Sequence, residues 1–184
     1  MESFGYIAGL AAIVIGLSLT EAASGLYRLL RHGVIRSDPL IGARIVLLVM
    51  MLVAIWFDTW AIRGITSLYS YPFFLLIFGQ LLLLYLMSAS CVPTETASLD
   101  REPTNVLFWR VFVAYQLAYS ALWLVFQTDK GFDLHSLVLR SYEVLVPLTV
   151  GLVLSVRRER TLHAIGVVTL IGFEIYSYWN ARIG

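Results

Sequence analysis

The chain has 184 residues, which is the size of one domain. Hydrophobic residues make up 59% of it and charged residues 14%, whereas a soluble domain has roughly 45–50% and about 25%. This composition excludes a water-soluble enzyme, a nucleic-acid-binding protein and a disordered tail. The net charge of +1 gives no reason to expect a polyanionic partner. We therefore expect an integral membrane protein that forms one transmembrane domain over residues 1–184.

Six apolar stretches follow one another along the chain, each close to the ~20 residues that a membrane helix needs. The predicted spans are residues 4–28, 40–62, 71–91, 105–127, 137–156 and 161–180. Continuous apolar runs indicate helices, because the strands of a membrane barrel would show short segments of alternating polarity. The predicted fold is therefore all-α, a polytopic bundle of six transmembrane helices.

The basic residues at the ends of the spans predict the orientation, because positively charged loops stay in the cytoplasm. Seven lie at the first, third and fifth loops, and three lie on the opposite side. The seven are Arg28, Arg31, Arg36, Arg101, Arg157, Arg158 and Arg160, and the three are Arg63, Lys130 and Arg182. We expect loops one, three and five in the cytoplasm and both termini outside.

Two segments of the first span, IGLSLTE at 15–21 and GLYRLLR at 25–31, resemble small bacterial inner-membrane proteins that have no assigned role. The resemblance covers one helix and implies no function. Together with the helical spans, it places the expected location in a bacterial inner (plasma) membrane.

Charged residues within the spans fall into two layers when each is placed by the ~1.5 Å rise per residue of a helix. The layer near the outer side holds Asp58, Arg140, Glu143 and Glu174, and the layer near the cytoplasmic side holds Glu21, Arg44 and Arg110. Gln80 and Gln116 lie closer to the middle. A charge near the bilayer centre costs at least ~2.5–3.5 kcal/mol, so each of these groups needs a partner or a function.

Two interpretations fit these layers. In the first, the charges are ion pairs between helices, with Glu21 bound to Arg44 or Arg110 and Arg140 bound to Glu143, Asp58 or Glu174. In the second, the acids form a path for protons or simple cations, since three acids share the outer layer with one base. Pro147 favours the second, because it has no N–H for the carbonyl of Glu143 and leaves that oxygen free beside the carboxylate.

The leading hypothesis is a small channel or transporter for protons or simple cations, with no catalytic residues. Glu143, Glu174 and Asp58, with Arg140 beside them, form the outer site, and Glu21 forms an inner gate with Arg44 and Arg110. The motifs HExxH and GxSxG and a Walker loop are missing from the sequence, so we do not expect an enzyme. Cys91 is the single cysteine, and we expect neither a metal nor a cofactor.

The first span also carries a stripe of small residues that includes Gly5, Gly9 and Gly16. Such a face lets another helix approach closely, either in the same chain or in another subunit. The alternative function is therefore a non-conducting accessory or anchoring subunit of a larger membrane complex. It would touch its partner through this stripe or through an aromatic face such as Tyr115 and Tyr119. Beyond the lipid bilayer, the expected partners are further copies of the chain or a larger complex, and no nucleic acid.

Overall fold

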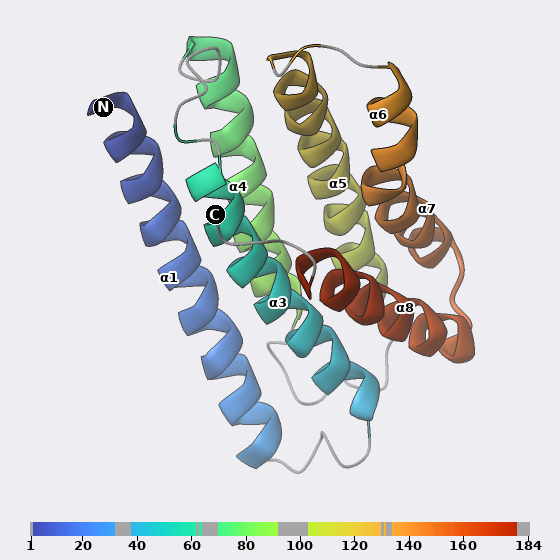
Figure 1. Ribbon diagram of the computed structural model, residues 1–184. Helices are drawn as coiled ribbons and strands as arrows, with labels where there is room; N and C mark the ends of the chain where they lie inside the picture. The colour runs from blue at the N-terminus through green and yellow to red at the C-terminus, as the bar shows by residue number, and fades with distance from the viewer. Residues whose placement is uncertain are drawn as a thin grey trace.

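The structure is a computed structural model that describes residues 2–31, 38–61, 63, 70–91, 103–129, 131 and 134–179. The helices are α1 (Glu2–Arg31), α3 (Pro39–Ala61), α4 (Tyr71–Cys91), α5 (Pro103–Asp129), α6 (Leu134–Arg140), α7 (Tyr142–Val156) and α8 (Arg160–Trp179). They form one bundle (Figure 1). The described residues contain no strand, which confirms the predicted all-helical fold class.

Five of these helices are long and apolar enough to cross a membrane. The five are α1, α3, α4, α5 and α8, whose apolar parts are Phe4–Arg31, Pro39–Trp60, Tyr71–Cys91, Val106–Gln127 and Arg160–Trp179. They correspond to five of the six predicted spans, and they are compatible with an integral membrane protein. Long apolar runs without an internal break make each of them continuous.

The predicted span at 137–156 is different, because the helix breaks at Ser141, between α6 and α7. The Ser141 hydroxyl donates a hydrogen bond to the carbonyl of Val138 at 2.8 Å, and so competes with the helical backbone for that acceptor. Pro147, which the sequence marks as the point of disruption, lies inside α7. With 15 residues, α7 is about 22 Å long, shorter than the ~30 Å hydrocarbon core.

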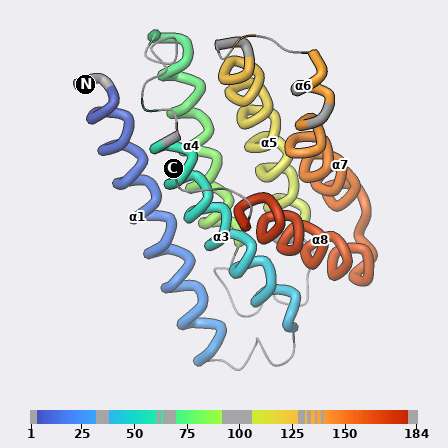
Figure 2. The backbone as a smooth tube through the Cα atoms, viewed as in Figure 1, coloured from blue at the N-terminus to red at the C-terminus, as the bar shows by residue number. Residues whose placement is uncertain are grey.

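Five helices pack as a closed ring, in the order α3, α4, α5, α7 and α8, with α8 returning to α3. The first helix, α1, lies outside this ring and packs against α3 and α4. Figure 2 shows α1 at one edge of the bundle and α7 with α8 at the other. The ring is therefore the part of the molecule that can enclose a site.

Two contacts far apart in the sequence tie α8 to α3, although α8 runs obliquely in Figure 1. Near the start of both helices, Arg160 binds Asp38 with 3.2 Å between its guanidinium nitrogen and a carboxylate oxygen. Near their ends, the Tyr178 hydroxyl lies 3.1 Å from each carboxylate oxygen of Asp58. The two helices therefore run in the same direction and are held at both ends.

The bundle has two distinct ends. We call one the N-terminal end, because the ring of Phe4 lies 5.5 Å from that of Trp60 at the end of α3. The other is the arginine-rich end, which carries Arg28, Arg31, Arg157, Arg158 and Arg160. The orientation prediction also uses Arg36, Arg101, Lys130 and Arg182, which lie outside the described residues.

The half of the bundle toward the arginine-rich end is densely packed. Many of its side chains are between 0% and 2% exposed, among them Leu47, Leu48, Leu84, Met87, Phe108, Trp109, Phe112, Leu154, Val167 and Leu170. We call this region the packed half. Gly151 permits a close approach of α7 to α5, since a Cβ at this position would lie 2.6 Å from the ring of Phe112. Gly166 does the same between α8 and Leu154.

Candidate functional site: an acidic and aromatic cavity

A cavity of about 310 Å³ lies inside the helix ring, toward the N-terminal end. Side chains of α3, α4, α5, α7 and α8 line it, together with Arg140 at the end of α6. On α5 the lining runs from Tyr115 to Gln127, which is about 18 Å along the helix. It stops at Met51 on α3 and at Leu81 on α4, and the packed half begins beyond these residues.

All four residues of the predicted outer layer line this one cavity. Asp58 comes from α3, Arg140 from α6, Glu143 from α7 and Glu174 from α8. Their depth along the spans could be read from the sequence. Their convergence could not, because it depends on how the four helices are rotated about their axes.

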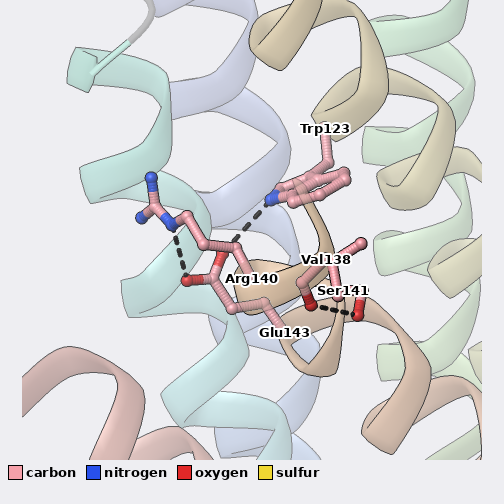
Figure 3. Close-up of polar contacts among 5 residues, drawn as sticks. All are labelled: Trp123, Val138, Arg140, Ser141 and Glu143. Carbon is pink, nitrogen blue, oxygen red and sulfur yellow. Dashed lines mark hydrogen bonds and ion pairs between the residues drawn. The ribbon is translucent and has the colours of Figure 1, made fainter. Parts of the chain in front are cut away.

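Among the acids that line the cavity, Glu143 forms an ion pair with a basic residue. Its carboxylate accepts a hydrogen bond from the indole nitrogen of Trp123 at 3.2 Å and from Nε of Arg140 at 3.1 Å (Figure 3). The predicted pairing of Arg140 with Glu143 is confirmed, although the break at Ser141 puts the two residues on different helices. Pro147, also predicted to matter here, lines the cavity one turn further along α7.

The other two acids have no basic partner among the residues that the structure describes. Asp58 is held by the hydroxyl of Tyr178, which lies 3.1 Å from both of its oxygens. Glu174 makes no hydrogen bond or ion pair within the described part of the chain, and its carboxylate interacts electrostatically with that of Asp58. Because Arg140 is the one base among the lining residues, the cavity carries an excess of acid.

Buried polar atoms without a hydrogen-bond partner occur along the wall of the cavity. The side chains of Gln80 and Gln116 are 3% and 4% exposed, and both line it. Within the described residues, the amide oxygen of Gln116 has no hydrogen-bond partner, whereas the amide of Gln80 interacts with the hydroxyl of Tyr115. Ser177, on α8, also has a buried hydroxyl without a partner there. Buried polar atoms are nearly always bonded in proteins, so these atoms face a space that suits a polar guest or water.

Aromatic rings make up much of the remaining wall. They are Tyr115, Tyr119, Trp123 and Phe126 from α5, and Phe173 and Tyr178 from α8. Tyr115 and Tyr119 were candidates for a face that contacts another protein, but both line the cavity, and Tyr115 is 5% exposed. Since apolar residues occur all around α5, their periodicity does not reveal the inward face. The useful signal is the recurrence of large aromatic residues every three to four positions beside Gln116.

The predicted inner gate is not assembled by the described contacts. Glu21 lies on α1, outside the ring, and its ion pair is with Arg28 on the same helix at 3.9 Å. Arg44 is buried on α3, whereas Arg110 is exposed on α5. The three residues share a depth in the bundle, but the position of α1 outside the ring keeps Glu21 away from the cavity.

The glycine stripe of α1 faces outward. Gly5, Gly9 and Gly16 are exposed, and a Cβ at any of them would meet no atom within 4 Å. The side of α1 that packs on α3 and α4 instead carries buried residues such as Ile7 and Ala11. Any packing partner of these glycines therefore lies beyond the described part of this chain.

The described residues contain no group of three or more His, Cys, Asp or Glu side chains placed to hold a metal ion. Cys91 is buried at the end of α4 as a free thiol. The acids of the cavity come from separate helices, and one of them is already bound to Arg140. The chemistry that this arrangement offers is attraction of a positive charge.

These features define a class of protein: an all-helical chain with five apolar helices of membrane-crossing length, four of which line an acidic and aromatic cavity together with the shorter α7. No protein-family model, characterised protein or solved structure matches the chain. The functional argument therefore depends on the cavity itself.

Proposed function

We propose that the protein is a small transporter or channel for protons or simple cations. In this proposal α6 and α7 together make a sixth crossing, and both termini lie outside a bacterial inner membrane. The observation that carries it is a cavity within apolar helices where three carboxylates face one arginine. Acids inside a membrane domain are costly, and they commonly mark the path of an ion or a proton.

The packed half supports a transporter over an open channel. Beyond the residues that line the cavity, each helix of the ring continues with fully buried side chains, among them Leu48 on α3, Leu84 on α4 and Phe112 on α5. A binding cavity toward one end of the bundle, with fully buried side chains toward the other, matches one state of an alternating-access cycle. In the proposed orientation, this state faces outward.

The contacts suggest separate roles for the three acids. Glu174, which has no described partner, and the neighbouring Asp58 hold the cation. Arg140 balances the charge of Glu143, and half of the Arg140 side chain is exposed. A cation in the cavity can compete with Arg140 for Glu143, whereas Asp58 and Glu174 have no basic partner to displace among the described residues.

Flux through liposomes tests the proposal. The purified protein is reconstituted under a proton gradient and under a sodium or potassium gradient, and flux is compared between the wild type, Glu174→Gln and Glu143→Gln. Both substitutions keep the shape of the side chain but remove its charge, so we expect flux to be lost in each. Glu159→Gln is the matched control, because Glu159 is exposed between α7 and α8, far from the cavity. Unchanged flux in both cavity variants would refute the assignment.

The exposed glycine stripe of α1 favours a second candidate, a non-conducting accessory or anchoring subunit. Gly5, Gly9 and Gly16 offer a face where another helix could approach closely, either from a further copy of the chain or from a larger membrane complex. A well-folded protein that carries no flux and co-purifies with another membrane protein would favour this candidate over transport.

A further inference from the structure

We propose that the cavity binds a small organic ammonium ion, with its charge between Asp58 and Glu174 and its body against the aromatic wall. This inference rests on the part of the proposed function in which these carboxylates hold a cation, and it extends the bound cation from protons and simple inorganic ions to an organic one. Three independent features of the cavity support it: its size, its lining and its unsatisfied polar atoms.

The size of the cavity fits a molecule rather than a bare ion. Its volume of about 310 Å³ is roughly twice that of the ~150 Å³ apolar cavity known to accommodate benzene. By the same proportion, it has room for a compound of about twelve non-hydrogen atoms. A single dehydrated inorganic ion would leave most of this space to water.

The lining combines acids with aromatic rings, and this combination suits an ammonium group that carries apolar substituents. Tyr119 and Trp123 come from α5, and Phe173 comes from α8. The face of an aromatic ring attracts a cation, most strongly when the cation is poorly hydrated. Hard metal ions instead require several oxygen ligands that converge at short distance. The described residues provide no group of three or more such acidic, histidine or cysteine side chains.

Gln80 and Gln116 add a polar end to the site. The free amide oxygen of Gln116 is an acceptor on a side chain more than nine-tenths buried, and the equally buried amide of Gln80 interacts with the hydroxyl of Tyr115. A hydroxyl group on the bound compound could donate a hydrogen bond to the oxygen of Gln116. A lipid acyl chain in the same space would leave this oxygen unpaired at considerable cost, so Gln116 argues against lipid as the occupant.

Two isosteric probes test the inference. Choline carries a quaternary ammonium and a hydroxyl, and 3,3-dimethylbutan-1-ol has the same shape with a neutral carbon in place of the nitrogen. Binding of each to the purified full chain in lipid nanodiscs is measured by isothermal titration calorimetry. We expect saturable binding of choline and binding of the neutral alcohol at least about tenfold weaker.

Variants then locate the bound probe. Glu174→Gln and Tyr119→Leu should each weaken choline binding about tenfold, whereas Tyr119→Phe, which keeps the ring, should retain it. Phe78→Leu is the matched control, because Phe78 is an exposed ring on α4 that does not line the cavity. Thermal unfolding of every variant checks that it is folded, and the charge variant and the ring variant provide separate tests.

Liposome flux of choline, protons and sodium, measured on the same variants, separates this inference from the proposed function. If proton or sodium flux depends on Glu174 while choline does not bind, the inference is overturned and the transport proposal stands. If choline binds as expected but none of the three cations moves, the binding site is supported and transport is refuted. Equal binding of choline and its neutral analogue overturns the inference, and the absence of both binding and flux overturns both proposals.

Discussion

Gly151→Ala tests the tight contact between α5 and α7 that closes the packed half. The added methyl group would lie 2.6 and 2.8 Å from two ring carbons of Phe112 and 3.3 Å from a methyl carbon of Val113. The ring has little freedom to move away, because Phe112 is 1% exposed and lies edge-on to Trp109 at 5.4 Å between ring centres. We therefore expect this substitution to destabilise the protein.

The magnitude follows from two opposing effects. Forcing a methyl group into a packed core costs about 1–3 kcal/mol, while alanine gains about 1 kcal/mol over glycine inside a helix. Gly172→Ala on α8 should have the helical gain alone, since a Cβ there would meet no atom within 4 Å. The two variants should thus differ by about 1–3 kcal/mol, or by roughly 2–12 °C in Tm for a chain of this size.

Thermal unfolding of the purified variants in the same detergent provides the assay. We expect Gly151→Ala to unfold below Gly172→Ala by the stated margin. If Gly151→Ala unfolds at the same temperature as Gly172→Ala or above it, α5 and α7 do not approach as closely as described. The seal beneath the cavity would then need a different explanation.

Two further predictions concern single side chains. Tyr178→Phe removes the hydroxyl that contacts both oxygens of Asp58, and should lower the free energy of unfolding by about 1.5–3 kcal/mol. Tyr6→Phe is the control, because the Tyr6 side chain is 76% exposed. Equal Tm values for the two variants would show that the Tyr178 hydroxyl does not anchor α8. Cys91 is 1% exposed, so a maleimide should modify its thiol after denaturation but not in the folded protein, and a gel shift measures the extent of modification. Rapid labelling of the native protein would contradict the burial of the end of α4.

Most of the fold could be predicted from the sequence, because long apolar runs in a membrane can satisfy their backbone only as helices. The runs at 40–62 and 71–91 agree with α3 and α4 to within a residue or so. The break at Ser141 was missed, since the residues on both sides are apolar and read as one span. Pro147 is the stronger helix breaker by composition, yet it lies inside α7, and the one-residue interruption falls at Ser141, whose backbone dihedral angles stay in the helical region.

The sequence predicts how deep each site residue lies along its helix, but not how each helix is rotated about its axis. Spacing along each span places Asp58, Glu143 and Glu174 in one layer, and all three line the cavity. The same reasoning grouped Glu21 with Arg44, although α1 lies outside the ring. Tyr115 was assigned to an outer face for a related reason. A helix that is apolar all round carries no periodic signal to show which side faces the interior.

The division of the bundle into a cavity and a packed half has an electrical consequence. If water fills the cavity, the electrical potential at Met51 and Tyr115 would be close to that of the solution on the same side of the membrane. Most of the voltage across the membrane would then fall across the packed half. A transported cation would then gain or lose most of ~2.3 kcal/mol per charge at 100 mV while it crosses only that layer. If the protein transports a cation, the side chains of the packed half would thus also set how steeply the transport rate depends on voltage.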